Sequence, residues 1–157
     1  MILCIDPGTL TGWATPTGSG VWNLAPLKAR KRPPATAEPE QVRCGRLFTL
    51  VSDEARDGQR VVVEGAAAFM RGKAAVKVSH ELRGAIKAAC HYARAVYEEV
   101  QPQDWKRTMF GRANVLPDEY LARAQSDLHY RGESEDEAAA LWLLTWATRY
   151  GAGRDVE

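Results

Sequence analysis

The sequence predicts one mixed α/β domain, in which an antiparallel meander of three strands precedes alternating helices and strands. Its 157 residues suffice for a single domain, which we expect to span 1–157. Apolar residues make up 45% of the chain and charged residues 26%, the balance of a globular protein with a buried core. After the first 24 residues, β-branched runs alternate with stretches of helical periodicity. This alternation is typical of a central sheet covered by helices.

The three strands of the meander follow from short apolar stretches separated by turn residues. The first stretch ends at Asp6, where Pro7-Gly8-Thr9 favours a turn. The second and third stretches contain Trp13 and Trp22 and are separated by Pro16-Thr17-Gly18-Ser19. The strands are expected at residues 1–5, 11–15 and 20–24.

The rest of the chain predicts an exposed basic loop, four helices and two further strands. Residues 25–39 are rich in proline and basic side chains, which favours a loop. The run Val61-Val62-Val63 predicts a buried strand that ends at Glu64. Helices are expected over 40–56, 75–99, 117–130 and 134–150, and the further strands over 60–64 and about 98–101.

The net charge of +1 conceals an uneven distribution along the chain. Residues 28–112 contain 17 Lys and Arg against 10 Asp and Glu, whereas residues 113–157 contain 4 against 9. A basic middle and an acidic tail indicate a protein that binds a polyanion and also needs clustered carboxylates.

Membrane, zinc and serine-triad chemistry are disfavoured by the sequence. No apolar run approaches the roughly 18–20 residues that cross a bilayer, and the N-terminus lacks the basic segment of a signal peptide. The three cysteines and three histidines are scattered without zinc or triad spacing. We therefore expect a cytoplasmic protein with reduced thiols and no membrane partner.

Three acids occupy positions that favour a shared site. Asp6 and Glu64 end buried strands, and Asp136 begins the last helix ahead of an apolar run. Ligand sites in α/β sheets lie beyond the carboxyl ends of the strands, so neighbouring strands would bring Asp6 and Glu64 together. Crowded carboxylates repel one another unless a cation compensates them, and Mg²⁺ prefers oxygen ligands. Two such ions about 4 Å apart suit phosphodiester hydrolysis. Taken alone, Asp136 also suits a plain helix-capping role.

The sequence resembles RuvC-type Holliday-junction resolvases, especially their phage-encoded relatives, over most of its length. The motifs that carry the resemblance occur in the family's order. They are Asp6-Pro7-Gly8-Thr9 with Thr11-Gly12-Trp13-Ala14, Val62-Val63-Glu64, Leu82-Arg83-Gly84-Ala85-Ile86 with Ala88-Ala89, Val100-Gln101-Pro102 with Trp105-Lys106 and Gly111-Arg112-Ala113, and Asp136-Glu137-Ala138-Ala139-Ala140-Leu141.

The resemblance implies an RNase H-like fold, with a central mixed sheet flanked by helices. It further implies a homodimer that nicks four-way and other branched DNA symmetrically, in a bacterial or phage-infected cell. The catalytic carboxylates correspond to Asp6, Glu64 and Asp136, and the basic residue near the scissile phosphate corresponds to Lys106. The implied cofactor is Mg²⁺, as two ions, with Mn²⁺ as a substitute.

One position departs from the family pattern. The fourth acid of the family falls at position 139, where this chain has Ala139. Either Glu133 or Glu137 supplies the missing oxygen in a natural variant, or an aspartate was changed to alanine to silence the enzyme. The otherwise intact motifs favour the second explanation.

Basic and aromatic residues outside the acidic motifs are candidates for DNA contact. Basic side chains neutralise phosphates, and an aromatic ring can stack on an opened base step. The spacing around Gly72-Lys73 excludes a phosphate-binding loop there. The chain is also too short for the two-lobed ATPases that begin with a similar Asp-Pro-Gly-Thr motif. No nucleotide cofactor is therefore expected. The candidates for DNA contact are Lys28, Arg30, Lys31, Arg32, Phe69, Arg71, Lys73, Lys77 and Arg112.

Two other functions remain open at this point. One is a junction-binding protein without activity, which Ala139 supports. The other is a related RNase H-like nuclease that acts on ribosomal RNA precursors.

Overall fold

A computed structural model describes residues 1–24, 39–66 and 73–151. Five strands form one sheet in the order β3-β2-β1-β4-β5. The first three strands pair antiparallel, and β4 and β5 continue the sheet parallel to β1. This confirms the predicted meander followed by parallel strands. The strands are β1 (Ile2–Asp6), β2 (Leu10–Thr15), β3 (Gly18–Asn23), β4 (Arg60–Glu64) and β5 (Val96–Val100).

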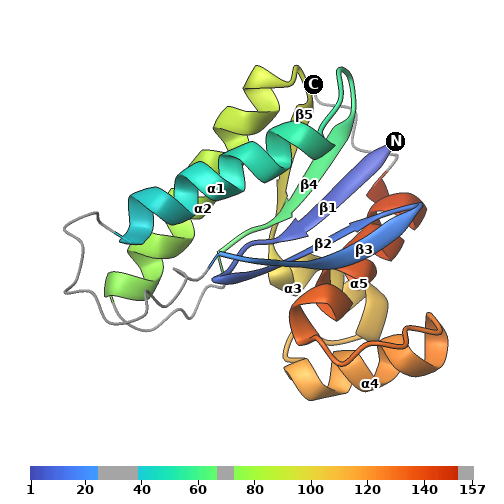
Figure 1. The fold of residues 1–157 in the computed structure, drawn as a ribbon. Helices are drawn as coiled ribbons and strands as arrows, with labels where there is room; N and C mark the ends of the chain where they lie inside the picture. The colour runs from blue at the N-terminus through green and yellow to red at the C-terminus, as the bar shows by residue number, and fades with distance from the viewer. Residues whose placement is uncertain (25–38, 67–72, 152–157) are drawn as a thin grey trace.

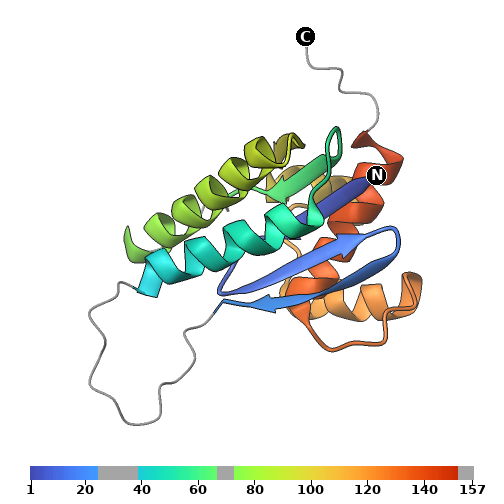
Figure 2. The ribbon, with the colours of Figure 1, turned by 45° about the horizontal axis from the view of Figure 1, so that its top comes forward.

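Helices cover both faces of this sheet (Figure 1). Two helices that run side by side in the same direction cover the first face, and three helices gather on the second, as the turned view also shows (Figure 2). The helices are α1 (Pro39–Glu54) and α2 (Lys73–Tyr92) on the first face, and α3 (Pro102–Phe110), α4 (Pro117–Asp127) and α5 (Glu135–Arg149) on the second.

The alternation of side chains along the strands creates two separate cores. Leu3 and Ile5 pack with α1 and α2, whereas Cys4 and Val62 pack with α5. Successive residues of a strand point to opposite faces, so Asp6 belongs to the same face as Cys4. Burying each large aliphatic side chain stabilises the fold by about 1.5–3 kcal/mol. The strands therefore direct their terminal acids toward α5.

The long helix predicted over 75–99 is shorter in the structure. It ends at Tyr92, and Arg94 adopts the left-handed conformation with φ 58°. The amide of Ala95 then donates to the carbonyl of Cys90 at 2.8 Å, which closes the helix in the manner of a Schellman motif. Because an arginine instead of the usual glycine takes this position, the sequence carried no visible stop signal. Residues 96–100 form β5.

A helix that the sequence analysis did not predict connects β5 to the second helical layer. It begins with Pro102 in its first turn and ends at Phe110, and the following Gly111 has a φ of 75°. Proline at the start and a left-handed glycine after the end are the expected boundaries of a short helix. None of the described helices has the combination of length and apolarity that a membrane crossing requires.

Candidate active site

Asp6 and Glu64 lie at the same edge of the sheet because β1 and β4 run parallel. Their register pairs Ile5 with Val63, which places the two terminal acids beside one another. Asp6 is partly buried, and Glu64 is only 9% exposed. β1 and β4 are thus neighbours, which is the condition under which the two acids were expected to lie together.

Asp136 reaches this edge through a close contact between β2 and α5. Gly12 is the register partner of Asp6 on β2. A Cβ atom at Gly12 would overlap the backbone carbonyl of Asp136, so only glycine permits this approach. The helix begins here because Ser134 caps it, with its hydroxyl accepting a hydrogen bond from the Glu137 amide at 3.2 Å.

The charges of Glu64 and Asp136 act on the carboxyl of Asp6. Burial, followed by the charges of Glu64 and Asp136, raises the pKa of Asp6 well above its usual value, against an opposing effect of Lys106. Burial also raises the pKa of Glu64 and that of Asp136. Partly buried carboxylates that repel one another lower the stability of the folded protein unless a cation compensates their charge. The arrangement therefore favours cation binding.

Among the side chains that the structure describes, Lys106 places a positive charge beside Glu64. Its ammonium lies 3.9 Å from Oε1 of Glu64, and its side chain is 17% exposed. The same nitrogen lies 5.2 Å from the ring centroid of Trp105 and 5.3 Å from that of Tyr120. Cation–π contact with two rings restricts the position of the ammonium beside Glu64.

Two buried polar atoms at the site have no hydrogen-bond partner among the described residues. They are Oε2 of Glu64 and Nε1 of Trp105. The indole nevertheless lies close enough to Glu64 to lower the pKa of its carboxyl against the larger effect of burial. Buried polar groups are rarely left unpaired in folded proteins. The unpaired oxygen of Glu64, a carboxylate whose charge acts on Asp6, is thus a candidate cation ligand.

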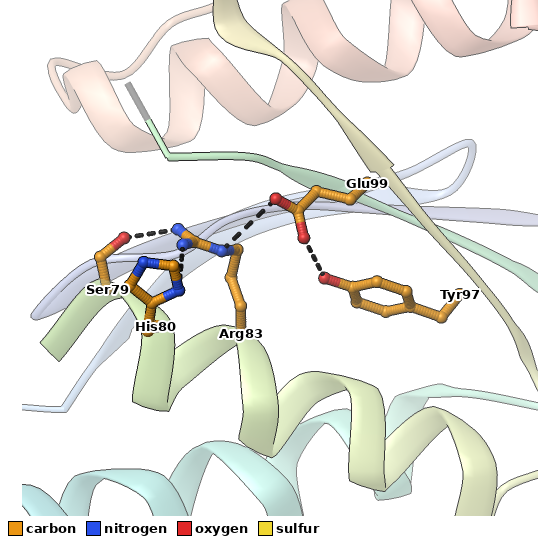
Figure 3. A network of polar contacts seen from close by, with 5 residues as sticks. All are labelled: Ser79, His80, Arg83, Tyr97 and Glu99. Carbon is orange, nitrogen blue, oxygen red and sulfur yellow. Dashed lines mark hydrogen bonds and ion pairs between the residues drawn. The ribbon is translucent and has the colours of Figure 1, made fainter. Parts of the chain in front are cut away.

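A polar network between α2 and β5 lies next to the end of the strand that carries Glu64 (Figure 3). The guanidinium of Arg83, 6% exposed, donates to the hydroxyl of Ser79 at 2.5 Å and lies 3.6 Å from the Glu99 carboxylate. Tyr97 donates to the other oxygen of Glu99 at 2.8 Å. Because Glu99 would contact a side chain placed at Gly65, the network sits against the residue that follows Glu64.

The three residues considered for the fourth acid have different surroundings. Ala139 is 2% exposed and belongs to the apolar core on the α5 side. Both oxygens of Glu137 accept hydrogen bonds, from the hydroxyl of Ser19 at 2.7 Å and from that of Tyr130 at 2.9 Å. Glu133 is exposed in the segment before α5. The Glu137 carboxylate therefore ties β3 to α5 rather than facing the other acids.

The described residues contain no ready-made metal cage. Within 1–24, 39–66 and 73–151, no three side chains of His, Cys, Asp or Glu converge closely enough to hold a metal ion in the conformation seen. The acids nonetheless lie within electrostatic range of Tyr120, because burial first, and then the charges of the three acids and Glu135, raise the pKa of that tyrosine. The described residues thus place hard oxygen donors beside the Lys106 ammonium.

Two of the predicted DNA-contacting residues, Lys77 and Arg112, lie in the described part of the chain together with their side chains. Lys77 lies on α2, with Glu81 at 3.6 Å, and Arg112 pairs with Glu119 beside α4. Six others lie outside the described residues; these are Lys28, Arg30, Lys31, Arg32, Phe69 and Arg71. For Lys73, the structure describes the backbone but not the side chain.

Three contributors to the site were missed by sequence reasoning. Gly12 and Trp105 stand in motifs already singled out, yet neither was assigned a role. Tyr120 falls within a predicted helix, and its contact with Trp105 depends on the packing of α4 beside α3. A tryptophan directly before the candidate lysine was the one signal that could have been used.

Comparison with solved structures identifies the fold. No protein-family model matches the sequence, and no curated protein sequence matches it either. The chain is similar to the structure of RuvC from Thermus thermophilus, with 19% identity, a TM-score of 0.64 and coverage of 96% of both chains. It is also similar to T. thermophilus RuvC in complex with a Holliday junction substrate, with 20% identity, a TM-score of 0.65 and coverage of 96% of this chain and 93% of that one. This chain therefore has the RNase H-like fold of RuvC over nearly its whole length.

Proposed function

We propose that this chain is a divalent-metal-dependent endonuclease that nicks branched DNA, with the four-way junction as its preferred substrate. The observation that carries the proposal is the acidic edge of the sheet. Asp6, Glu64 and the first turn of α5 meet there in a RuvC-like fold, beside the Lys106 ammonium. Carboxylates beside a lysine suit phosphodiester hydrolysis, which needs both a cation site and a charge that stabilises the phosphate.

The donor set fits a hard divalent cation such as Mg²⁺, with Mn²⁺ as a substitute. Asp6, Glu64 and Asp136 would hold it, because oxygen ligands are those that Mg²⁺ prefers. Two observations support the fit, namely the unpaired Oε2 of Glu64 and the raised pKa of Asp6. A cation bound by these residues would supply positive charge to the phosphate and would activate water.

The residues of the chain supply the remaining steps. The Lys106 ammonium neutralises a non-bridging oxygen of the scissile phosphate and is held in place by Trp105 and Tyr120. Tyr120 is 7% exposed and Trp105 fully buried, so these rings exclude water from one side of the site. Charges aimed at the phosphate in such a partly dry setting are stronger than they would be in bulk water.

Branched DNA and a homodimer complete the proposal. One of the similar structures is RuvC in complex with a Holliday junction substrate, which supports this substrate class. The chain has a single acidic edge of this kind among its described residues, so symmetric nicking of two strands calls for two copies related by a two-fold axis. The proposed setting is the cytoplasm of a bacterium, or of a bacterium infected by a phage that encodes the protein.

A nicking assay on synthetic substrates tests the proposed substrate class. Wild-type protein with Mg²⁺ is expected to nick a four-way junction faster than a three-way junction, and linear duplex least of all. Cleavage of structured RNA without cleavage of branched DNA would contradict the proposal and favour a nuclease of ribosomal RNA maturation.

A junction-binding protein without activity is the second candidate, and Ala139 is the observation that favours it. The discriminating experiment compares wild type with Ala139→Asp. Tight junction binding by both proteins, without nicking in Mg²⁺ or Mn²⁺, would select this candidate. A gain of nicking in Ala139→Asp alone would show that the alanine silences the enzyme.

A further inference from the structure

We propose that Arg83 is a positioning residue for the acidic edge of the sheet, and that it acts on the end of β4 through Glu99. The proposal rests on the proposed function, because the residue that it positions is Glu64. Arg83 belongs to the sequence motif at 82–86, to which the acidic edge assigns no role. A chain of contacts leads from this arginine on α2 to Gly65, the residue that follows Glu64.

The guanidinium of Arg83 is buried and held on three sides. The residue is 6% exposed, and its guanidinium donates to the hydroxyl of Ser79 at 2.5 Å. A second nitrogen lies 3.2 Å from Nδ1 of His80, and Nε lies 3.6 Å from Oε1 of Glu99. Ser79 and His80 lie one turn earlier on α2, so two contacts fix the guanidinium to its own helix (Figure 3). The planar guanidinium therefore places a fixed charge against β5.

Glu99 receives this charge at the end of β4. Its other oxygen accepts a hydrogen bond from the hydroxyl of Tyr97 at 2.8 Å, so both carboxylate oxygens have partners. Glu99 is the register partner of Val63 on β4. Register partners project to the same face of a sheet, and Val63 packs in the core beneath α1 and α2. Glu99 thus lies beside the last turn of the β4 pleat, on the face that α2 covers.

The contact reaches the backbone at Gly65. The amide of Gly65 donates to the carbonyl of Val100 at 2.8 Å, which continues the pairing of β4 with β5. A Cβ atom at Gly65 would lie 3.0 Å from Oε1 of Glu99 and 3.0 Å from Nε2 of Gln101. The carboxylate held by Arg83 therefore lies against the backbone where β4 ends.

Glu64 depends on this strand end because it is the last residue of β4. Its side chain projects to the face opposite Val63, where Oε1 lies 3.9 Å from the ammonium of Lys106. A displacement of about 1 Å in a catalytic group can slow a reaction by about 10²-fold. Arg83 thus acts from the far face of the sheet, by position and without contact with the DNA.

Stability alone gives Arg83 little reason to be charged. The Glu99 side chain is 35% exposed, and an ion pair with such a partner adds little net stability. Burying a guanidinium opposes folding, and apolar replacements of buried charges are often tolerated. We therefore expect Arg83→Met to fold with a thermal stability close to that of the wild type, which separates positioning from folding.

The first measurement is amide hydrogen exchange, followed by NMR on the full-length chain. The Gly65 amide is expected to exchange about tenfold faster or more in Arg83→Met, because the end of β4 loses its support locally. The Val96 amide donates to the carbonyl of Gln59 at 2.8 Å, at the opposite end of β5. It should exchange at the wild-type rate, which a general loss of stability would not allow.

The second measurement is the nicking of a four-way junction at steady state. Arg83→Met should lower kcat by about tenfold, a barrier increase of about 1.4 kcal/mol, and leave KM within about twofold. Glu99→Gln, which keeps the size of the side chain, should lower kcat similarly. Because the two residues act as one unit, the double variant should be no slower than the slower single variant.

Lys87→Met is the matched control. Lys87 lies on the same helix, with its ammonium 5.8 Å from the ring centroid of Tyr97, and its side chain is exposed. Its replacement removes a charge beside the same network. Neither the exchange of Gly65 nor kcat should change in this variant.

Three results would overturn the inference. They are equal acceleration of exchange at Gly65 and Val96 in Arg83→Met, a wild-type kcat in that variant, and effects of the two single variants that multiply in the double variant. A wild-type protein that nicks no junction with Mg²⁺ or Mn²⁺ would overturn the proposed function instead. The exchange rate of Gly65 would then still decide whether Arg83 supports the end of β4.

Discussion

The α-carbon of Gly12 packs directly against the backbone carbonyl of Asp136, with no room for a side chain between β2 and the first turn of α5. Gly12 is also the register partner of Asp6 on the neighbouring strand. One glycine thus sets the distance between a strand acid and a helix acid that lie 130 positions apart in the sequence. The acidic edge exists because this contact is so close.

Replacing Gly12 by alanine should therefore displace the start of α5. We expect Gly12→Ala to lower stability by about 1–3 kcal/mol, the usual effect of overpacking. Nicking should fall much further than stability, because Asp136 moves away from Asp6. Thermal unfolding and a nicking assay at a temperature where the variant is folded measure the two effects separately.

Gly45→Ala is the matched control for this prediction. Gly45 is exposed on α1, and a Cβ atom there meets nothing within 4 Å. The change should raise stability by about 0.5–1 kcal/mol, because alanine is the better helix former. Equal loss of activity in the two variants would contradict the special role of Gly12.

Asp6→Asn should stabilise the metal-free protein at neutral pH while removing its activity. Burial and two neighbouring carboxylates raise the pKa of Asp6 in the folded state above its usual 3.8. The wild-type protein consequently loses stability as pH rises from about 3.8 through the raised pKa, a loss that asparagine does not share. The expected gain at pH 7 is about 1–2 kcal/mol.

The sign of this effect is checked by repeating the unfolding measurements at low pH in EDTA. The advantage of Asp6→Asn should shrink below pH 4, where Asp6 is protonated and resembles asparagine in charge. An advantage that stays constant between pH 3 and pH 8 would show that repulsion at Asp6 is not its cause.

Glu137 should prove to be a structural residue rather than a metal ligand. Its carboxylate connects Ser19 on β3 with Tyr130 ahead of α5. We expect Glu137→Ala to lower stability by about 1–3 kcal/mol, since partly buried hydroxyls lose their acceptor. The Kd for Mn²⁺, measured by calorimetry, should change by no more than about twofold. This is a small change in binding free energy, because each 1.4 kcal/mol corresponds to a tenfold change in Kd. Glu133→Ala, a change at an exposed glutamate nearby, should alter neither quantity.

Lys106→Met should slow the chemical step more than it weakens DNA binding. The variant keeps the aliphatic stem but removes the ammonium beside Glu64. Loss of one such charge at a phosphate is expected to lower kcat by about 10²-fold. Single-turnover nicking together with junction affinity separates the two quantities. A proportionate loss of affinity without any change in kcat would place Lys106 among general phosphate contacts instead.

The sequence predicted those parts of the molecule that depend on local pattern. The strand Arg60–Glu64 has its predicted bounds because three β-branched valines precede a single acid. The meander likewise followed from two turn-rich breaks. The end of α2 was placed too late, since Arg94 closes it in a conformation that usually signals glycine.

The candidate site likewise contains features that the sequence could predict and features that it could not. Asp6 and Glu64 could be paired from the sequence, because parallel strands bring their carboxyl ends to one edge. The contact of Gly12 with Asp136 and the packing of Tyr120 against Trp105 depend on how helices dock, which no local pattern records. The surroundings of Glu137 also became visible only once Ser19 and Tyr130 were placed.

The most direct test of the account is the nicking of a four-way junction by wild type and Asp6→Asn, each with Mg²⁺ and with EDTA. We predict paired nicks at symmetry-related positions by the wild type with Mg²⁺, no nicks with EDTA, and junction binding without nicking by Asp6→Asn. Nicking by Asp6→Asn at the wild-type rate, or by either protein in EDTA, would contradict the assignment of the acidic edge as the catalytic site.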